Sequence, residues 1–282
     1  MFYIKYRQFL IFTGIVVFLI TILILVGHFH FKTGNINQNN GNHGNEITNS
    51  NEDTNLQEDS GNAKNSKSNK NKTMTILMYH HVSDEVKGEK YYFVSPSAFF
   101  DQMKYLNDNG YTALTFENFK DFNKYKKPVM ITFDDGYMDN YAYAYPILKR
   151  FNIKATMFLI TGSLNKPDYL TTDVVKEMSG LVSFQSHTVN HINLSLSDEN
   201  TIEKECCQSK NDIEKILSRK INTIAYPFGL YNANTVNIAK KYYDYCVTGN
   251  VGVYKKGDIT YILNRMPVAN ADSLASFAKK VE

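Results

Sequence analysis

Short apolar segments alternate with amphipathic helical patterns from Met74 to the C-terminus. We predict strands at residues 74–79, 128–133, 155–160, 181–185, 223–226 and 245–248. We predict helices at residues 97–109, in the stretch that ends at 151, and at 172–179, 198–217, 234–242 and 273–280. Repeated alternation of this kind indicates an α/β fold in which helices cover a parallel sheet. The pattern alone is compatible with a closed barrel and with an open doubly wound sheet.

An almost unbroken apolar stretch covers residues 9–27, with Thr13 and Thr21 as its polar side chains. A helix of this length can cross the hydrocarbon core of a bilayer. Lys5 and Arg7 precede it, which favours a cytoplasmic N-terminus and an external position for the rest of the chain. We therefore expect residues 1–32 to form a short cytoplasmic tail and a retained membrane anchor. A cleaved signal peptide is the alternative, although no good cleavage site follows the apolar stretch.

The composition changes abruptly after this stretch. Residues 33–73 are rich in Asn and almost devoid of large apolar side chains. Such a segment cannot bury enough apolar surface to offset its conformational entropy. We therefore predict a disordered linker at 33–73 and one folded domain at 74–282, which is large enough for a substantial core.

Charge and cysteine content argue against several classes of protein. The chain has 31 basic and 28 acidic residues, which is too even for the clustered positive surface that binds nucleic acid. Cys206 and Cys207 are adjacent and Cys246 stands alone, so the three indicate neither a disulfide framework nor a zinc site. We expect the cysteines to be small buried side chains and the protein to be a monomer.

Two adjacent carboxylates, Asp134 and Asp135, directly follow the predicted strand 128–133, and Gly136 comes next. The C-terminal ends of parallel strands are where α/β folds place reactive groups. Neighbouring side chains point in different directions, so one carboxylate can bind a cation while the other faces a substrate. Gly136 permits the sharp turn. The motif alone is equally compatible with an Asp that caps a helix.

Two histidines, His187 and His191, follow the predicted strand 181–185. Imidazoles four residues apart lie on one side of a helical turn and can chelate one ion. With one carboxylate they form a ligand set for zinc or iron(II) that leaves positions for water and substrate. A chance pair is the alternative, because the glutamate of H-E-x-x-H is missing. The position at a strand end favours a functional role.

A third motif, Y-P-F-G at residues 226–229, is by itself only a tight turn. Together with T-F-D-D-G at 132–136 and H-T-x-x-H at 187–191, it resembles the ordered motifs of the NodB-homology polysaccharide deacetylases (carbohydrate esterase family 4). The resemblance covers residues 127–268. Residues 77–82 (L-M-Y-H-H-V) resemble a subgroup that includes the N-deacetylases of poly-β-1,6-N-acetylglucosamine. The family resemblance implies a distorted barrel of β/α units.

The same resemblance implies roles for individual residues. Asp134 stands in the place of the general base. Asp135, His187 and His191 stand in the places of three metal ligands, and the backbone N–H of Phe228 in that of an oxyanion donor. One divalent metal is implied, with zinc favoured and cobalt or nickel as alternatives. A bound Zn²⁺ lowers the pKa of its water to about 7 and polarises an amide carbonyl, which suits N-acetyl hydrolysis.

The chain departs from the family pattern at two places. Ala225 stands where many members carry an Arg beside the base. Arg265 is a candidate substitute, and an exposed or purely structural Arg is the alternative. No His follows His191, so the late Leu-x-His motif that supplies a general acid is missing. His80 is a candidate for the acid or another site role, whereas a role for His81 is disfavoured. The base itself, once protonated, could also return its proton to the amine.

We therefore predict a membrane-tethered enzyme that removes N-acetyl groups from an extracellular polysaccharide of the envelope or biofilm. Poly-N-acetylglucosamine is the favoured substrate, peptidoglycan is next, and an O-acetyl xylan esterase shares the motifs. A non-catalytic glycan-binding protein with a degenerate site is an alternative from another class, but such a protein has no need for the complete set of Asp134, Asp135, His187 and His191. A 2-His-1-carboxylate oxygenase would have no use for Asp134.

Overall fold

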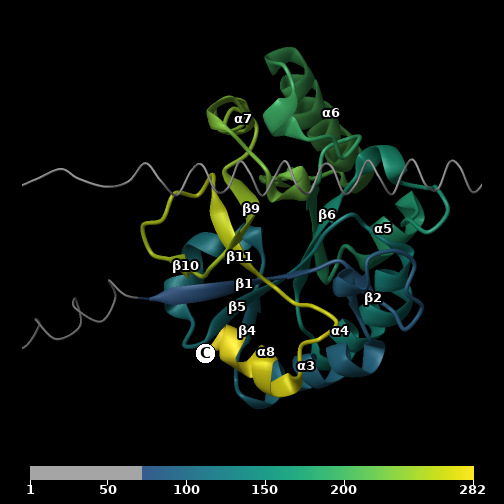
Figure 1. Cartoon of the computed structure of the whole chain (residues 1–282), viewed down its shortest axis with the longest axis vertical. Coiled ribbons are helices and arrows are strands. Elements are labelled where there is room, and N and C mark those ends of the chain that lie inside the picture. The colour runs from purple at the N-terminus through teal and green to yellow at the C-terminus, as the bar shows by residue number, and fades with distance from the viewer. Residues whose placement is uncertain (1–71) are drawn as a thin grey trace, which may run out of the picture. The chain divides into compact units, whose positions relative to one another are not determined.

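The computed structural model describes residues 72–282 (Figure 1). Its strands are β1 (Thr73–Tyr79), β2 (His81–Val82), β3 (Phe93–Val94), β4 (Thr112–Leu114), β5 (Pro128–Phe133), β6 (Ala155–Leu159), β7 (Val182–Ser186), β8 (Thr223–Ala225), β9 (Tyr245–Val251), β10 (Tyr254–Lys255) and β11 (Leu263–Pro267). Its α-helices are α3 (Pro96–Asp108), α4 (Tyr145–Phe151), α5 (Thr172–Met178), α6 (Glu199–Leu217), α7 (Ala233–Ala239) and α8 (Leu274–Val281). The 3₁₀ segments are η1 (Lys90–Tyr92), η2 (Phe116–Lys124), η4 (Thr161–Ser163), η5 (Leu194–Leu196) and η6 (Pro227–Gly229), and η3 (Asn140–Ala144) is a π-helix.

The predicted anchor and almost all of the predicted linker lie outside the described residues. Within 72–282, the structure contains no helix with both the length and the apolar character that a membrane span needs.

Parallel strands close into a barrel. β1 pairs with β5 on one side and with β11 on the other, and the remaining neighbours follow the order β11-β9-β8-β7-β6-β5. β4 joins the first half of β5 in parallel, and β10 pairs antiparallel with the start of β1. The alternation seen in the sequence therefore builds a β/α barrel, as the family resemblance implied, and not an open sheet.

The barrel is irregular between β7 and β8, where Ser186 and Ile224 form the register pair. The side-chain oxygen of Gln185 accepts hydrogen bonds from the backbone N–H groups of Asn222 (3.1 Å) and Thr223 (2.9 Å). The Gln185 side chain thus replaces backbone hydrogen bonds between β7 and β8. These bonds are missing next to the segment that carries the two predicted histidine ligands.

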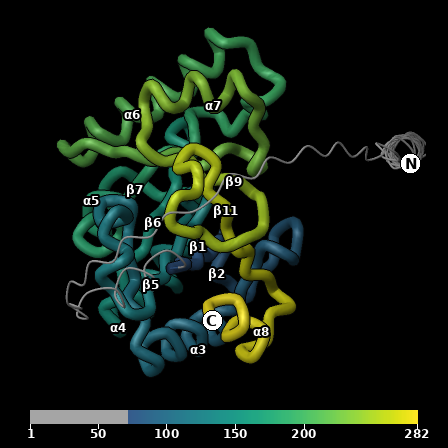
Figure 2. The backbone as a smooth tube through the Cα atoms, turned by 90° about the vertical axis from the view of Figure 1, so that its left-hand side faces the viewer, coloured from purple at the N-terminus to yellow at the C-terminus, as the bar shows by residue number. Residues whose placement is uncertain are grey.

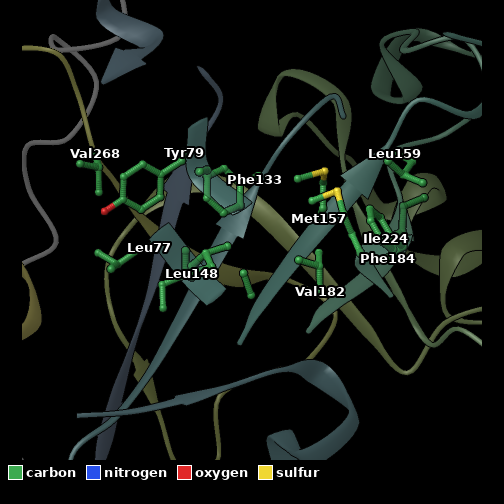
Figure 3. Packing of buried hydrophobic residues seen from close by; sticks show 14 of the residues in the cluster. Leu77, Tyr79, Phe133, Leu148, Met157, Leu159, Val182, Phe184, Ile224 and Val268 are labelled. Atoms are coloured by element: carbon green, nitrogen blue, oxygen red, sulfur yellow. The ribbon is translucent and has the colours of Figure 1, made fainter. Parts of the chain in front are cut away.

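Successive side chains of each strand point alternately into the barrel and outward beneath the helices. Figure 3 shows part of the outer layer, which includes Leu77, Tyr79, Phe133, Leu148, Met157, Leu159, Val182, Phe184, Ile224 and Val268. On β5, Met130 belongs to the inner cluster and Ile131 to the outer one. The same alternation carries Asp134 to the inner face. It also carries Arg265 there, two residues after Leu263 of the inner cluster.

Helices surround the barrel (Figures 1 and 2). α8 packs against α3 and α3 against α4, while α6 packs against both α5 and α7. We predicted no element between residues 109 and 128, where the structure has β4 and η2. Phe116, Phe119 and Phe122 of η2 recur every third residue, the period of a 3₁₀ turn. They pack with Tyr245 at the N-terminal end of the strands, opposite the end that carries the site.

Most predicted elements are confirmed to within about two residues. α6 begins after Asp198, whose side chain accepts a hydrogen bond from the backbone N–H of Thr201 (2.8 Å). α7 ends at Ala239, three residues before the predicted end, because the chain turns to place Tyr243 against α6. There the Tyr243 hydroxyl donates to the carbonyl of Cys206 (2.8 Å). Cys206 and Cys246 are buried free thiols as expected, and Cys207 is half-buried.

Candidate active site and metal-ligand cluster

The C-terminal ends of the barrel strands surround a cavity of about 480 Å³. Every residue for which the sequence predicted a site role lines it: His80, Asp134, Asp135, His187, His191, Phe228 and Arg265. Sequence reasoning did not single out several further lining residues: Met78, Lys87, Glu89, Tyr91, Tyr92, Phe93, Tyr137, Gly249, Val251 and Pro267. Many of these flank β2 and β3, which were too short to show a periodic pattern.

The two carboxylates diverge at the end of β5. The backbone N–H of Asp134 donates to the carbonyl of Tyr79 (3.0 Å), which continues the strand pairing, and Asp135 (φ 74°) and Gly136 (φ 80°) then turn the chain. A Cβ on Gly136 would lie 2.7 Å from a methyl carbon of Leu159, so a larger residue would have to displace that side chain and adopt a left-handed backbone. The helix-cap interpretation is wrong, because the helical residues begin only at Met138 and Asp135 itself has a left-handed backbone.

Arg265 holds the carboxylate of Asp134 through two hydrogen bonds, Nη1 to Oδ1 (2.7 Å) and Nη2 to Oδ2 (2.8 Å). Arg265 is 1% exposed and Asp134 is 3% exposed, so Arg265 is not a surface residue. Burial by itself would raise the pKa of Asp134. The guanidinium of Arg265, with a smaller contribution from His187, instead holds the pKa of Asp134 well below its usual range. Asp134 is therefore ionised and fixed in direction.

Asp135, His187 and His191 form a compact cluster of potential ligand atoms, all within 4.8 Å of one another. Oδ1 of Asp135 lies 3.4 Å from Nε2 of His187 and 3.6 Å from Nε2 of His191. This oxygen is buried, and no hydrogen-bond donor among residues 72–282 reaches it. Buried carboxylate oxygens need a partner, and a metal ion held by both imidazoles would be one.

The imidazoles are in the form that suits a metal ligand. Nδ1 of His187 lies 2.9 Å from the carbonyl oxygen of Ala225, so it carries the proton and leaves Nε2 free toward Asp135. Burial raises the pKa of Asp135 and lowers the pKa of both His187 and His191. Neutral imidazoles keep the lone pair that a metal ion requires. The residues present therefore fit one divalent ion.

The predicted helical turn between the two histidines is wrong. Thr188 (φ 66°) and His191 (φ 54°) are in the left-handed region, which ends any helical continuation. An irregular loop brings the two rings together instead, with centroids 4.8 Å apart. The backbone N–H of His191 donates to the hydroxyl of Thr188 (3.0 Å) within this loop. The two rings are therefore brought together by a loop and not by the helical turn that their spacing predicted.

Tyr137 and His81 support the cluster from the side. The hydroxyl of Tyr137 faces the carboxylate of Asp135 and opposes the rise in its pKa that burial causes. The Tyr137 ring stacks on His81 (centroids 3.7 Å apart), and His81 stacks on Phe93 (4.0 Å) on its other face. Nδ1 of His81 is 2.6 Å from a carboxylate oxygen of Asp139. His81 thus packs against Tyr137, while its neighbour His80 lies beside Asp134.

His80 and Phe228 also line the cavity. Nε2 of His80 lies 3.9 Å from Oδ2 of Asp134, and burial lowers the pKa of His80 to about 4. Phe228 has φ 59°, and its ring, 62% exposed, lies 4.5 Å from the ring of His191. The turn that carries Phe228 rests on β9, because a Cβ on Gly229 would lie 2.3 Å from the backbone nitrogen of Gly249.

A β/α barrel that gathers a buried, ionised carboxylate and a two-imidazole, one-carboxylate cluster at one mouth has the groups that a metal-assisted hydrolase needs. Residues 122–245 match the family model described as "Polysaccharide deacetylase". The relative from Bacillus subtilis (strain 168) that carries the name "Putative polysaccharide deacetylase YxkH" is 35% identical over 222 residues, covering 76% of this chain and 78% of that relative. The chain therefore belongs to the polysaccharide deacetylase family and is a hydrolase that removes acetyl groups.

One further relative and one solved structure are also similar to this chain. The poly-β-1,6-N-acetyl-D-glucosamine N-deacetylase of Staphylococcus aureus (strain MRSA252) is 35% identical over 178 residues, which cover 56% of this chain and 60% of that relative. The structure of the deacetylase PplD of Streptococcus pyogenes, in complex with acetate, matches with a TM-score of 0.71 and 33% identity. That match covers 75% of this chain and 99% of PplD.

Proposed function

We propose that this protein is a metal-dependent enzyme that removes N-acetyl groups from a polysaccharide of N-acetylglucosamine, with poly-β-1,6-N-acetylglucosamine as the favoured substrate. The observation that carries the proposal is the buried oxygen of Asp135 between two imidazoles, which has no hydrogen-bond partner within residues 72–282 and lies next to the carboxylate that Arg265 holds. The relative from Staphylococcus aureus supports the choice of substrate.

The proposal places this chemistry at the cell surface. The apolar stretch 9–27 would act as a membrane anchor, with Lys5 and Arg7 on the cytoplasmic side. The Asn-rich residues 33–73 would let the catalytic domain reach an envelope glycan.

Asp135, His187 and His191 are the residues that would hold one divalent ion, for which zinc is favoured by the mixed nitrogen and oxygen donors. Such an ion, when bound, polarises the amide carbonyl and lowers the pKa of a water molecule to about 7.

The remaining residues have separate tasks. Asp134 accepts the proton of the attacking water, while Arg265 keeps that carboxylate oriented toward the cavity. The backbone N–H of Phe228 donates a hydrogen bond to the oxyanion that develops on the carbonyl oxygen. Asp134 then passes its proton to the leaving nitrogen, so acetate and a free amine result and no second acid is required. His80 lies beside Asp134 and is therefore also placed to form a hydrogen bond with the leaving nitrogen of the substrate.

Acetate release by the full-length protein from N-acetylglucosamine oligomers, with added divalent metal, tests this proposal. Asp134→Asn should lower the rate by about 10²–10⁴-fold, the usual contribution of a general base. Asp101→Asn makes the same change on the exposed surface of α3 and should leave the rate unchanged. Equal acetate release by the wild type and Asp134→Asn would refute the assignment. Acetylated xylan and peptidoglycan fragments, tested in parallel, would show whether another acetylated glycan is preferred.

A further inference from the structure

The loop between β7 and η5 carries both imidazoles of the metal-ligand cluster, and it contains no helix or strand of its own. Two of its residues, Thr188 and His191, have φ in the left-handed region. Residues other than Gly remain in this region only where the surrounding structure holds them there. The positions of the two imidazoles therefore depend on contacts from outside the loop.

Glu205 on α6 makes the most extensive of these contacts. One carboxylate oxygen, Oε2, accepts hydrogen bonds from the backbone N–H groups of Val189 (2.7 Å) and Asn190 (3.0 Å). The other, Oε1, accepts one from the side-chain amide of Asn190 (2.6 Å). Glu205 is 5% exposed, so these bonds are largely shielded from water. Three donors from two adjacent loop residues thus converge on one buried side chain of a helix.

A second element holds the opposite edge of the same loop. The backbone N–H of Thr161 donates to the carbonyl of Thr188 (3.1 Å), and that of Gly162 donates to the carbonyl of Val189 (2.9 Å). A Cβ on Gly162 would lie 2.6 Å from the Val189 oxygen, so the two segments are in direct contact. The N–H of Val189 is therefore bonded to α6 and its carbonyl to η4.

α6 is itself joined to the end of β7. Ser209 lies one helical turn after Glu205, and its hydroxyl is 2.7 Å from the hydroxyl of Ser186. Ser186 in turn accepts a hydrogen bond from the backbone N–H of Thr188 (3.1 Å). The two polar side chains of α6 thus fix the start and the middle of the segment that runs from His187 to His191.

We propose that Glu205 is a positioning residue for the metal-ligand cluster, which sets the spacing of the two imidazoles and thereby the affinity for a divalent ion. The proposal rests on the proposed metal-dependent function. A carboxylate suits the task because it only accepts hydrogen bonds, and its two oxygens can serve all three donors. The length of the side chain also matters, since Asp at this position would be one methylene too short to reach Val189.

The experiment is a measurement of the zinc dissociation constant of the full-length protein by chelator competition, with the absorption spectrum of the cobalt-loaded protein as a second readout. Glu205→Ala and Glu205→Asp should each weaken zinc binding by about 10–100-fold, the usual effect of removing a group that orients metal ligands. Glu205→Gln keeps one oxygen for the two backbone N–H groups but turns a donor toward the amide of Asn190, so it should weaken zinc binding less than Glu205→Ala or Glu205→Asp. Glu205→Ala and Glu205→Asp should also show an altered cobalt spectrum, because the ligand geometry changes.

Glu203→Ala is the matched control. Glu203 lies on the same helix, and its side chain accepts a hydrogen bond from the hydroxyl of Tyr242 (2.7 Å), outside the loop. This variant should lose stability without any change in zinc affinity. If Glu205→Ala does not fold, the zinc affinities and cobalt spectra of Glu205→Asp and Glu205→Gln are compared instead.

The possible outcomes separate this inference from the proposed function. Zinc affinity and cobalt spectrum that stay at wild-type values in a folded Glu205→Ala or Glu205→Asp would overturn the role of Glu205. A wild-type protein that binds no divalent metal would overturn the proposed metal site and this inference with it. A wild-type protein that binds zinc in a Glu205-dependent way, but releases no acetate, would overturn the proposed function alone.

Discussion

Replacing Arg265 by Met leaves the carboxylate of Asp134 buried without its two charged hydrogen bonds. Arg265 is 1% exposed, so the side of the carboxylate that it holds is closed to bulk solvent. Removing one partner of a buried ion pair costs about 3–5 kcal/mol. The hydrogen bond from Nε of Arg265 to the carbonyl of Thr248 (3.0 Å), worth about 1 kcal/mol, is lost as well. We expect Arg265→Met to lower the free energy of unfolding by about 4–6 kcal/mol, a large share of the stability of a typical domain.

Urea unfolding of the metal-free, full-length protein, followed by circular dichroism, measures this loss. The double variant Arg265→Met/Asp134→Asn contains no unpaired charge, so its loss should be smaller than the sum of the two single losses by about 1–3 kcal/mol. Arg265→Lys keeps the charge without the planar fork and should lie between wild type and Arg265→Met. A loss below about 1 kcal/mol for Arg265→Met, or strictly additive single changes, would refute the reasoning.

Three further predictions concern a tyrosine that lines the cavity, a glycine in a turn and a partly buried aspartate. Tyr91 lines the cavity and is 50% exposed, so Tyr91→Ala should raise KM for long oligomers several-fold with little effect on kcat, measured by acetate release. Gly229→Ala puts a Cβ against backbone at φ 69° and should cost well over 1 kcal/mol in thermal unfolding, whereas Gly180→Ala, with no atom within 4 Å, should be nearly neutral. Burial would raise the pKa of Asp272, but hydrogen bonds from a backbone N–H and from Lys280 hold that pKa below its usual range. Its stabilising contribution is therefore present above about pH 4 and lost as the pH falls through the folded pKa, and Asp272→Asn should lack this dependence in unfolding curves.

The sequence predicted the strands and helices that are long enough to show a pattern of apolar residues of their own. The run at residues 128–133 is entirely buried and is bounded by Pro128 on one side and the D-D-G turn on the other, so the bounds of β5 were predicted correctly. β4 has three residues and β2 and β3 have two each, which is too short for any periodicity to appear. The closure of the barrel depends on the pairing of β1 with β5 and β11, which only the family resemblance implied.

In the candidate site too, the sequence predicted the residues that form motifs but not the contacts between residues far apart in the chain. The order and spacing of the motifs identified Asp134, Asp135, His187 and His191 as one cluster, and the structure brings them to one cavity. The backbone between the histidines was predicted wrongly, because Glu205 and other distant residues hold it. The contact between Asp134 and Arg265 joins positions 131 residues apart. Local periodicity cannot reveal such a contact, although the missing Arg at position 225 indicated that a substitute was needed.

The most direct test of the central claim is acetate release from poly-N-acetylglucosamine oligomers by chelator-treated protein, titrated with Zn²⁺, Co²⁺ or Ni²⁺. The metal content of the same samples is determined by elemental analysis. We expect negligible activity after chelation and full recovery at one equivalent of metal. His187→Ala should bind no stoichiometric metal and recover no activity. Full activity in protein that contains no metal, or in His187→Ala, would contradict the account.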